Sequence, residues 1–87
     1  MNGDRRYQIR HAAGQYWLLD MHQEVEDYKA PIVMNETGAL ILQSFWETDS
    51  IEGTALVLRE TYEIEMDEAM ADVKAFLSQL KRQGVVL

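Results

Sequence analysis

The spacing of apolar residues changes once along this chain of 87 residues, and the change limits the folds that it can adopt. Before Met34 the apolar runs are short, and Tyr7 and Ile9 alternate with polar residues as they do in a strand. After Asn35 apolar residues recur every three or four positions, which is typical of helices with one buried face. This order predicts an α+β fold, winged-helix-like, in which a three-stranded antiparallel β-sheet is followed by three α-helices.

The predicted strands cover residues 7–13, 15–20 and 31–34. Gly14 lies between the first two, which indicates a hairpin. Pro31 begins the third, and proline is tolerated at the first position of a strand or on an edge strand because it removes a ladder donor. We therefore expect the third strand to lie at an edge of the sheet. Residues 20–29 are polar and acidic without a clear period, and they are expected to form a long connection.

The predicted helices cover residues 36–46, 51–62 and 68–83. Asn35, Ser50 and Asp67 are expected to cap their N-termini, because these residue types accept hydrogen bonds from the first free N–H groups of a helix. Gly84 is expected just after the third helix, where a left-handed residue is common. The apolar face of the third helix is formed by Ala69, Met70, Val73, Phe76, Leu77 and Leu80.

Composition limits the functions that are open to a module of this size. We expect one domain, residues 1–87, with little room for a deep catalytic cleft. No cysteine is present, so disulfides, thiolate zinc sites and iron–sulfur ligation by this chain are excluded. No apolar run is long enough for export or membrane spanning, and together with the lack of cysteine this favours the cytoplasm.

Negative charge is concentrated in one part of the chain. The net charge is −7, and the stretch from Glu47 to Asp72 has nine carboxylates and one base, Arg59. Proteins that bind nucleic-acid phosphates have a clustered cationic surface. The third predicted helix instead begins with Asp67 and Glu68, so we expect no nucleic-acid partner.

No residue pattern indicates catalysis or metal binding. His11 and His22 are the two imidazoles, and neither lies at a metal-ligand spacing from a second histidine or a cysteine. The carboxylates of residues 63–68 fit helix caps and a solvated turn better than a water-poor acid–base pocket. We expect no catalytic residue, no metal site and no cofactor.

One strand edge and one helix flank have the features of a peptide site. An outermost third strand would accept a further strand from a peptide. The third helix has, beside its apolar face, a flank that combines acids, an aromatic ring and a small residue. Together they predict a groove for a peptide with apolar anchors and a positive charge. The predicted peptide-binding residues are Ile32, Val33, Met34, Glu68, Asp72, Ala75, Phe76 and Gln79.

Two short motifs resemble the PqqD family. Residues Asn35–Gly38 follow the third predicted strand, and Asp72–Leu77 lie in the third predicted helix, with Leu80 and Gly84 after them. In order and spacing the resemblance extends from about Tyr7 to Leu87. It implies a single PqqD-like peptide-recognition domain with three antiparallel strands and three helices.

The resemblance also implies a function. The namesake of the family is the peptide chaperone of pyrroloquinoline quinone biosynthesis, and related domains recognise ribosomally made peptides that are later modified. The leader segment of such a peptide pairs with the third strand, packs on the third helix and is presented to a modifying enzyme, often a radical S-adenosylmethionine (SAM) protein. Residues 20–29 look longer than in the quinone-pathway chaperone, so we expect a relative that serves another peptide system.

Three hypotheses follow, in decreasing order of support. The first is a non-enzymatic peptide chaperone whose partners are a precursor peptide and a modifying enzyme, expected to be a radical SAM enzyme, with no membrane partner. The alternative is a winged-helix adaptor or transcriptional regulator that binds another protein or DNA, and salt-sensitive binding in a gel shift would favour it. An enzyme is the third. An exposed edge strand is compatible with either a monomer or a homodimer.

Overall fold

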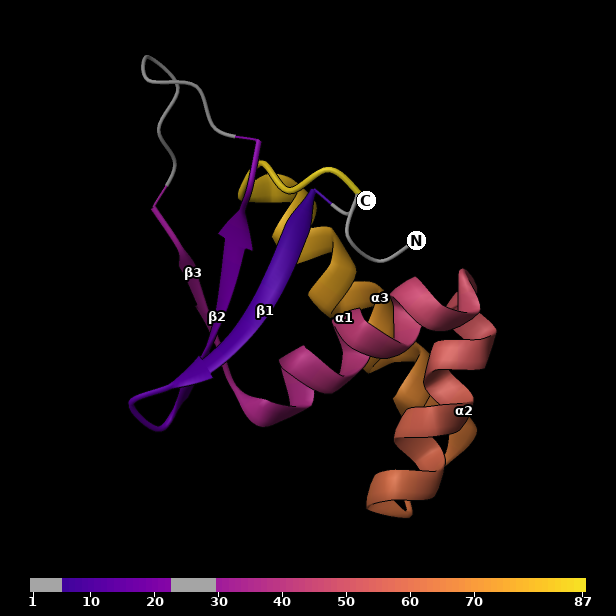
Figure 1. Cartoon of the computed structure of the whole chain (residues 1–87). Helices are drawn as coiled ribbons and strands as arrows, with labels where there is room; N and C mark the ends of the chain where they lie inside the picture. The colour runs from indigo at the N-terminus through magenta and orange to yellow at the C-terminus, as the bar shows by residue number, and fades with distance from the viewer. Residues whose placement is uncertain (1–5, 23–29) are drawn as a thin grey trace. The chain divides into compact units, whose positions relative to one another are not determined.

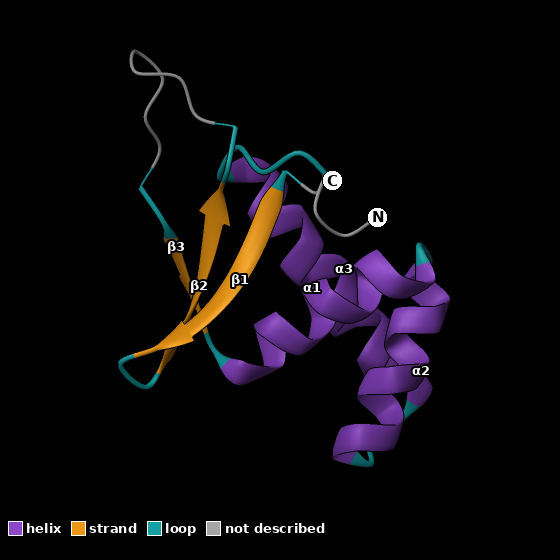
Figure 2. Ribbon diagram, viewed as in Figure 1, coloured by secondary structure: helices purple, strands orange, loops and turns teal. Residues whose placement is uncertain are grey.

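The computed structural model describes residues 6–22 and 30–87, and it has the predicted α+β arrangement (Figure 1). The elements are β1 (Tyr7–Ala12), β2 (Gln15–Asp20), β3 (Ile32–Met34), α1 (Glu36–Thr48), α2 (Ile51–Tyr62) and α3 (Met66–Arg82). All strands therefore precede all helices (Figure 2). The expected long connection over residues 20–29 lies largely outside the described residues.

The chain forms two compact units, which meet in the sequence within α1. One extends to Ala39 and contains the sheet, and the other begins at Leu40 and contains the rest of α1 with α2 and α3. The single domain of residues 1–87 stays a prediction.

The sheet has the strand order β1-β2-β3 and is antiparallel throughout. Ala13 and Gly14 connect β1 to β2 with φ values of 55° and 75°, and two successive positive values are the signature of a type I′ turn. Among the described strands β3 pairs with β2 alone, so it is an edge strand, as predicted. It begins at Ile32, so Pro31 lies just before the strand and not within it.

Side chains at the starts of α1 and α2 cap these helices as the sequence predicts. The Asn35 Oδ1 atom accepts a hydrogen bond from the Gly38 N–H at 2.7 Å, and the Ser50 Oγ atom accepts one from the Gly53 N–H at 3.0 Å. Each bond satisfies an N–H that has no partner within its helix. The sequence of the cap alone is therefore enough to locate both helix starts.

The predicted cap of α3 is wrong. The helix begins at Met66, and Glu65 occupies the N-cap position with extended backbone and no side-chain cap hydrogen bond. Asp67 lies inside the first turn, where a carboxylate is stabilised by the positive end of the helix macrodipole. At the other end Gly84 has a φ of 92°, so the prediction of a left-handed glycine after this helix is confirmed.

In the second unit α2 packs against α3. Of the predicted apolar face of α3, four residues are buried, namely Ala69, Val73, Leu77 and Leu80, while Met70 and Phe76 are partly exposed. Leu58 of α2 is 1% exposed. Thr54 is equally buried, although the sequence analysis did not assign it to the core; its hydroxyl donates to the Ser50 carbonyl at 2.7 Å, so the polar atom is satisfied.

Removing the cap of α2 should lower the stability of the fold. We expect Ser50→Ala to reduce the free energy of unfolding by about 1 kcal/mol, because the Gly53 N–H loses its acceptor. Urea unfolding followed by circular dichroism measures the change. Ser78→Ala is the matched control, since Ser78 is exposed within α3. Equal stabilities of the two variants would contradict the capping role.

Candidate functional site

The outer edge of β3 exposes backbone groups, and the register of the sheet determines which ones. The Met21 N–H donates to the Arg6 carbonyl at 2.7 Å, and Ala12 pairs with Gln15 across the two-residue turn. Because hydrogen-bonded and non-hydrogen-bonded pairs alternate along an antiparallel ladder, the odd-numbered residues of β2 bond to β1 and the even-numbered ones to β3. Residues 16 and 18 of β2 therefore direct their backbone groups toward β3.

Val33 is the residue of β3 whose backbone points outward. Tyr16 pairs with Met34 and Leu18 pairs with Ile32, so the backbone groups of Ile32 and Met34 are used within the sheet. Val33, opposite Trp17, is left with its N–H and its carbonyl directed to the free edge. Of the three predicted residues Ile32, Val33 and Met34, Val33 is thus the one whose backbone can pair with an added strand.

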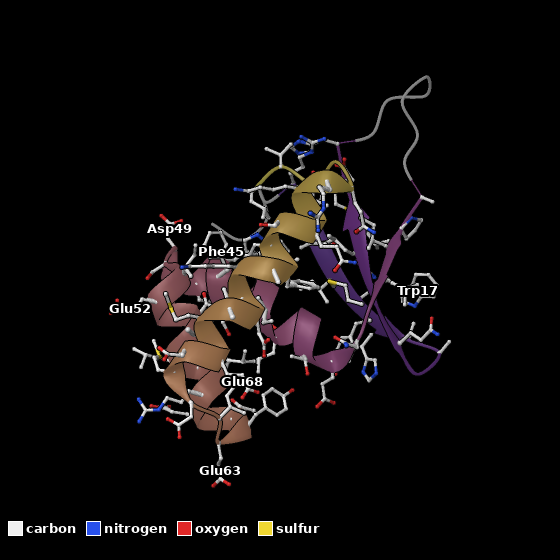
Figure 3. The ribbon with its side chains drawn as sticks, turned by 180° about the vertical axis from the view of Figure 1, so that it is seen from behind. Trp17, Phe45, Asp49, Glu52, Glu63 and Glu68 are labelled. Carbon is white, nitrogen blue, oxygen red and sulfur yellow. The ribbon has the colours of Figure 1, made fainter. Side chains whose placement is uncertain are left out.

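Side chains of β3 point alternately to the two faces of the sheet. Met34 is 5% exposed and contributes to the buried face, whereas Val33 is 51% exposed on the other face. Val33 and Trp17 form a non-hydrogen-bonded pair, the kind in which side chains approach most closely. The indole N–H of Trp17 donates to the Ala12 carbonyl at 3.2 Å, which holds the ring at the surface of the sheet (Figure 3). Trp17 and Val33 form the outer-face pair next to the free edge.

Sequence reasoning did not select Trp17 as a site residue. The apolar run that contains it predicted a strand, but the partner of Trp17 across the sheet depends on the pairing of β2 with β3. No local pattern specifies that pairing.

An open pocket of about 440 Å³ lies in the first unit at the end of β3. Val33 and Met34 line it together with Asn35 and Glu36 at the start of α1. The rings of His11 and Tyr16 also line it, and they are stacked with centroids 4.2 Å apart and an angle of 3° between their planes. A hollow therefore adjoins the free strand edge, with both aromatic and polar groups on its walls.

The predicted helix flank lies in the second unit, on α3. Glu68, Asp72, Ala75 and Gln79 are exposed, and Phe76 is partly exposed. Glu68 is in the first turn of the helix (Figure 3). The exposure of these side chains agrees with a flank that faces solvent beside the buried face. The strand edge and this flank belong to different units.

The described residues offer no cluster of three or more histidine, cysteine, aspartate or glutamate side chains that could hold a metal ion. The carboxylates of residues 63–68 are exposed, and Glu63 follows α2 with a left-handed φ of 53°. An ion pair joins the Arg6 Nη2 and Asp20 Oδ2 atoms at 2.9 Å. This hydrogen-bonded contact raises the pKa of Arg6 above its usual value, so it strengthens a charge that is already permanent. It stabilises the end of the β1–β2 hairpin and creates no acid–base group.

These features define a small α+β module with a free sheet edge. A family model described as coenzyme PQQ synthesis protein D (PqqD) matches residues 12–86. The chain therefore belongs to the PqqD family. The match begins at Ala12, the last residue of β1, whereas the resemblance was expected from about Tyr7. No curated protein and no solved structure matches the chain.

Members of the PqqD family are accessory proteins that bind a precursor peptide and partner enzymes in PQQ biosynthesis. This membership supports a role in natural-product biosynthesis and in peptide binding. Among the described residues, no helix has both the length and the apolar character that crossing a membrane requires.

Proposed function

We propose that this protein is a non-enzymatic peptide chaperone that binds the leader segment of a ribosomally synthesised precursor peptide. The leader adds as a strand beside β3 and is then presented to a modifying enzyme, a radical SAM maturase. The observation that carries the proposal is the outward N–H and carbonyl of Val33 on a free edge strand. Membership of the PqqD family supports it independently. Because the precursor is made by ribosomes, the proposal places binding in the cytoplasm.

Backbone pairing supplies only part of the binding free energy. Within β3 the N–H and the carbonyl of Val33 offer two hydrogen bonds, each of which contributes a net of about 0.5–1.5 kcal/mol, and Pro31, two positions earlier, has no N–H to add. A micromolar dissociation constant corresponds to about 8 kcal/mol. Side-chain contacts must supply most of the difference. Trp17 and Val33 on the outer face, and the pocket beside His11 and Tyr16, are the surfaces of the first unit that can do so.

The proposal assigns selectivity to the exposed flank of α3. Asp72 and Glu68 attract a basic leader residue, Phe76 and Ala75 offer apolar contact, and Gln79 offers hydrogen bonds. Each exposed ion pair is worth about 0.2–1 kcal/mol. The flank therefore contributes little to the total binding free energy, and its role is to favour leaders with a basic residue over leaders without one.

Titration of the uniformly ¹⁵N-labelled protein with the precursor peptide encoded beside its gene tests the proposal. We expect amide shifts at residues 32–34 and 68–79 and binding heat in calorimetry. Shifts at neither segment would refute the site, and shifts at residues 32–34 alone would remove the helix flank from it. Because the spectrum reports on amides throughout the protein, binding of the peptide at another surface would be seen as shifts elsewhere.

Reversing one charge tests the flank by itself. We expect Asp72→Lys to weaken a leader with a basic residue about three- to tenfold, because a weak attraction becomes a repulsion. Asp67→Lys makes the same charge change on the same helix, but Asp67 lies roughly 140° around the helix from Asp72 and outside the flank. Calorimetry with each variant gives the two affinities. Equal affinities would assign Asp72 a purely structural role.

A further inference from the structure

A second pocket, of about 170 Å³, lies wholly within the second unit. Its apolar lining comes from Phe45, Ile51, Leu77 and Leu87. Figure 3 shows Phe45 beside α3, the helix that contributes Leu77. An apolar cavity of roughly 150 Å³ accommodates a benzene molecule. The pocket is therefore large enough for one aromatic or branched aliphatic side chain.

The polar residues of this pocket are basic or neutral. Lys74, Ser78 and Lys81 of α3 line it, and no aspartate or glutamate side chain does. The basic lining contrasts with the rest of the second unit, since the sequence from residue 40 to residue 87 has nine Asp and Glu side chains and four Lys and Arg side chains. Both lysines are exposed, and neither has an ion-pair partner among the described residues. Two uncompensated ammonium groups thus stand beside one apolar hollow.

The lysines lie on the side of α3 away from its acidic flank. Lys74, Ser78 and Lys81 follow each other at intervals of four and three residues, so they form one stripe along the helix. With about 100° of rotation per residue, this stripe lies roughly 140° around the helix from that of Glu68 and Asp72. Beyond its first turn, where Asp67 lies on the same side as the lysines, the helix exposes a basic stripe that the buried face separates on one side from the acidic flank.

We propose that this pocket is a second docking site, which binds an acidic segment of a partner protein. One apolar side chain of the segment enters the hollow formed by Phe45, Ile51 and Leu77, and carboxylates beside it pair with Lys74 and Lys81. Charge complementarity selects the occupant, because a basic segment would be repelled by the lysines. The net charge of −7 does not prevent binding, since charges farther away than about 8 Å are largely screened at physiological salt. The inference goes beyond the proposed function and does not depend on it.

A blocked pentapeptide in which one tryptophan is flanked on each side by two glutamates is the probe. We expect it to shift the amide signals of Ile51, Lys74, Ser78 and Lys81 in the full-length ¹⁵N-labelled protein. A peptide with lysine in place of glutamate, and one with alanine in place of tryptophan, should each bind at least tenfold more weakly. Equal binding of either peptide would overturn the proposal, as would shifts confined to residues 32–34.

The double variant Lys74→Gln/Lys81→Gln should bind the acidic peptide at least tenfold more weakly and remain folded, because both side chains are exposed. Arg59→Gln removes a charge from α2 outside the pocket and is the matched control. Equal weakening by the two changes would refute a local role of the lysines.

Two further measurements test other occupants of the pocket. Tighter binding of decanoate than of the peptide would assign the pocket to small amphiphiles, and concentration-dependent shifts without peptide would assign it to a second copy of the chain. Either result overturns the proposal.

Discussion

Replacement of Val33 by proline should weaken leader binding tenfold or more while the three-stranded sheet remains. Proline removes the backbone N–H, and at this position the N–H points to the free edge and not to β2. The sheet therefore keeps its bonds through Ile32 and Met34. The leader loses one hydrogen bond and meets the pyrrolidine ring at the edge, and about 1.4 kcal/mol is enough for a tenfold change in affinity.

The control for this change is Val33→Thr, which keeps the N–H and the β-branched shape. Calorimetry with the leader peptide gives both affinities, and an amide spectrum of each variant verifies that the sheet is intact. If the proline and threonine variants bind the leader equally well with intact sheets, strand addition at β3 is refuted. Weak binding by both would instead point to the side chain of Val33.

Leu58→Ala should be the most destabilising simple substitution in α2. Leu58 is 1% exposed and α2 packs against α3, so the change leaves a cavity in the second unit. Such changes cost about 2–5 kcal/mol. Small domains have a total stability of only about 5–15 kcal/mol, so the variant is expected to be partly unfolded at moderate temperature.

Leu56→Ala is the matched control on the same helix. Leu56 is 42% exposed, and its truncation removes little buried surface. We expect a change within about 0.5 kcal/mol, as for most surface substitutions. Urea unfolding of the two variants compares them directly. A similar loss in both would mean that Leu58 is not part of a tightly packed core.

The features that the sequence predicted well are local. The caps at Asn35 and Ser50 were predictable because a cap needs one side chain and an N–H three residues later. The turn after β1 was marked by Gly14. The start of α3 was misplaced because Glu65 and Asp67 are both acidic and near the boundary, and composition alone does not tell an N-cap from a first-turn position.

The parts of the candidate sites that depend on distant residues could not be predicted. The outward direction of the Val33 backbone follows from the pairing of three strands, and a shift of one residue would reverse it. The pocket beside Lys74 needs Phe45 and Leu87, which are separated by more than half of the second unit's sequence. The acidic flank of α3, in contrast, follows from helical spacing within one element, and Glu68 and Asp72 are exposed.

The shortness of β3 has a consequence for the lifetime of a complex. A strand of three residues with one outward residue cannot form a long ladder, so a peptide paired with it is released without unfolding an extended sheet. At a micromolar dissociation constant and association rates of about 10⁵–10⁷ M⁻¹s⁻¹, the dissociation rate is on the order of 0.1–10 per second. In the proposed function, a leader held at this short edge would therefore exchange within about 0.1–10 seconds.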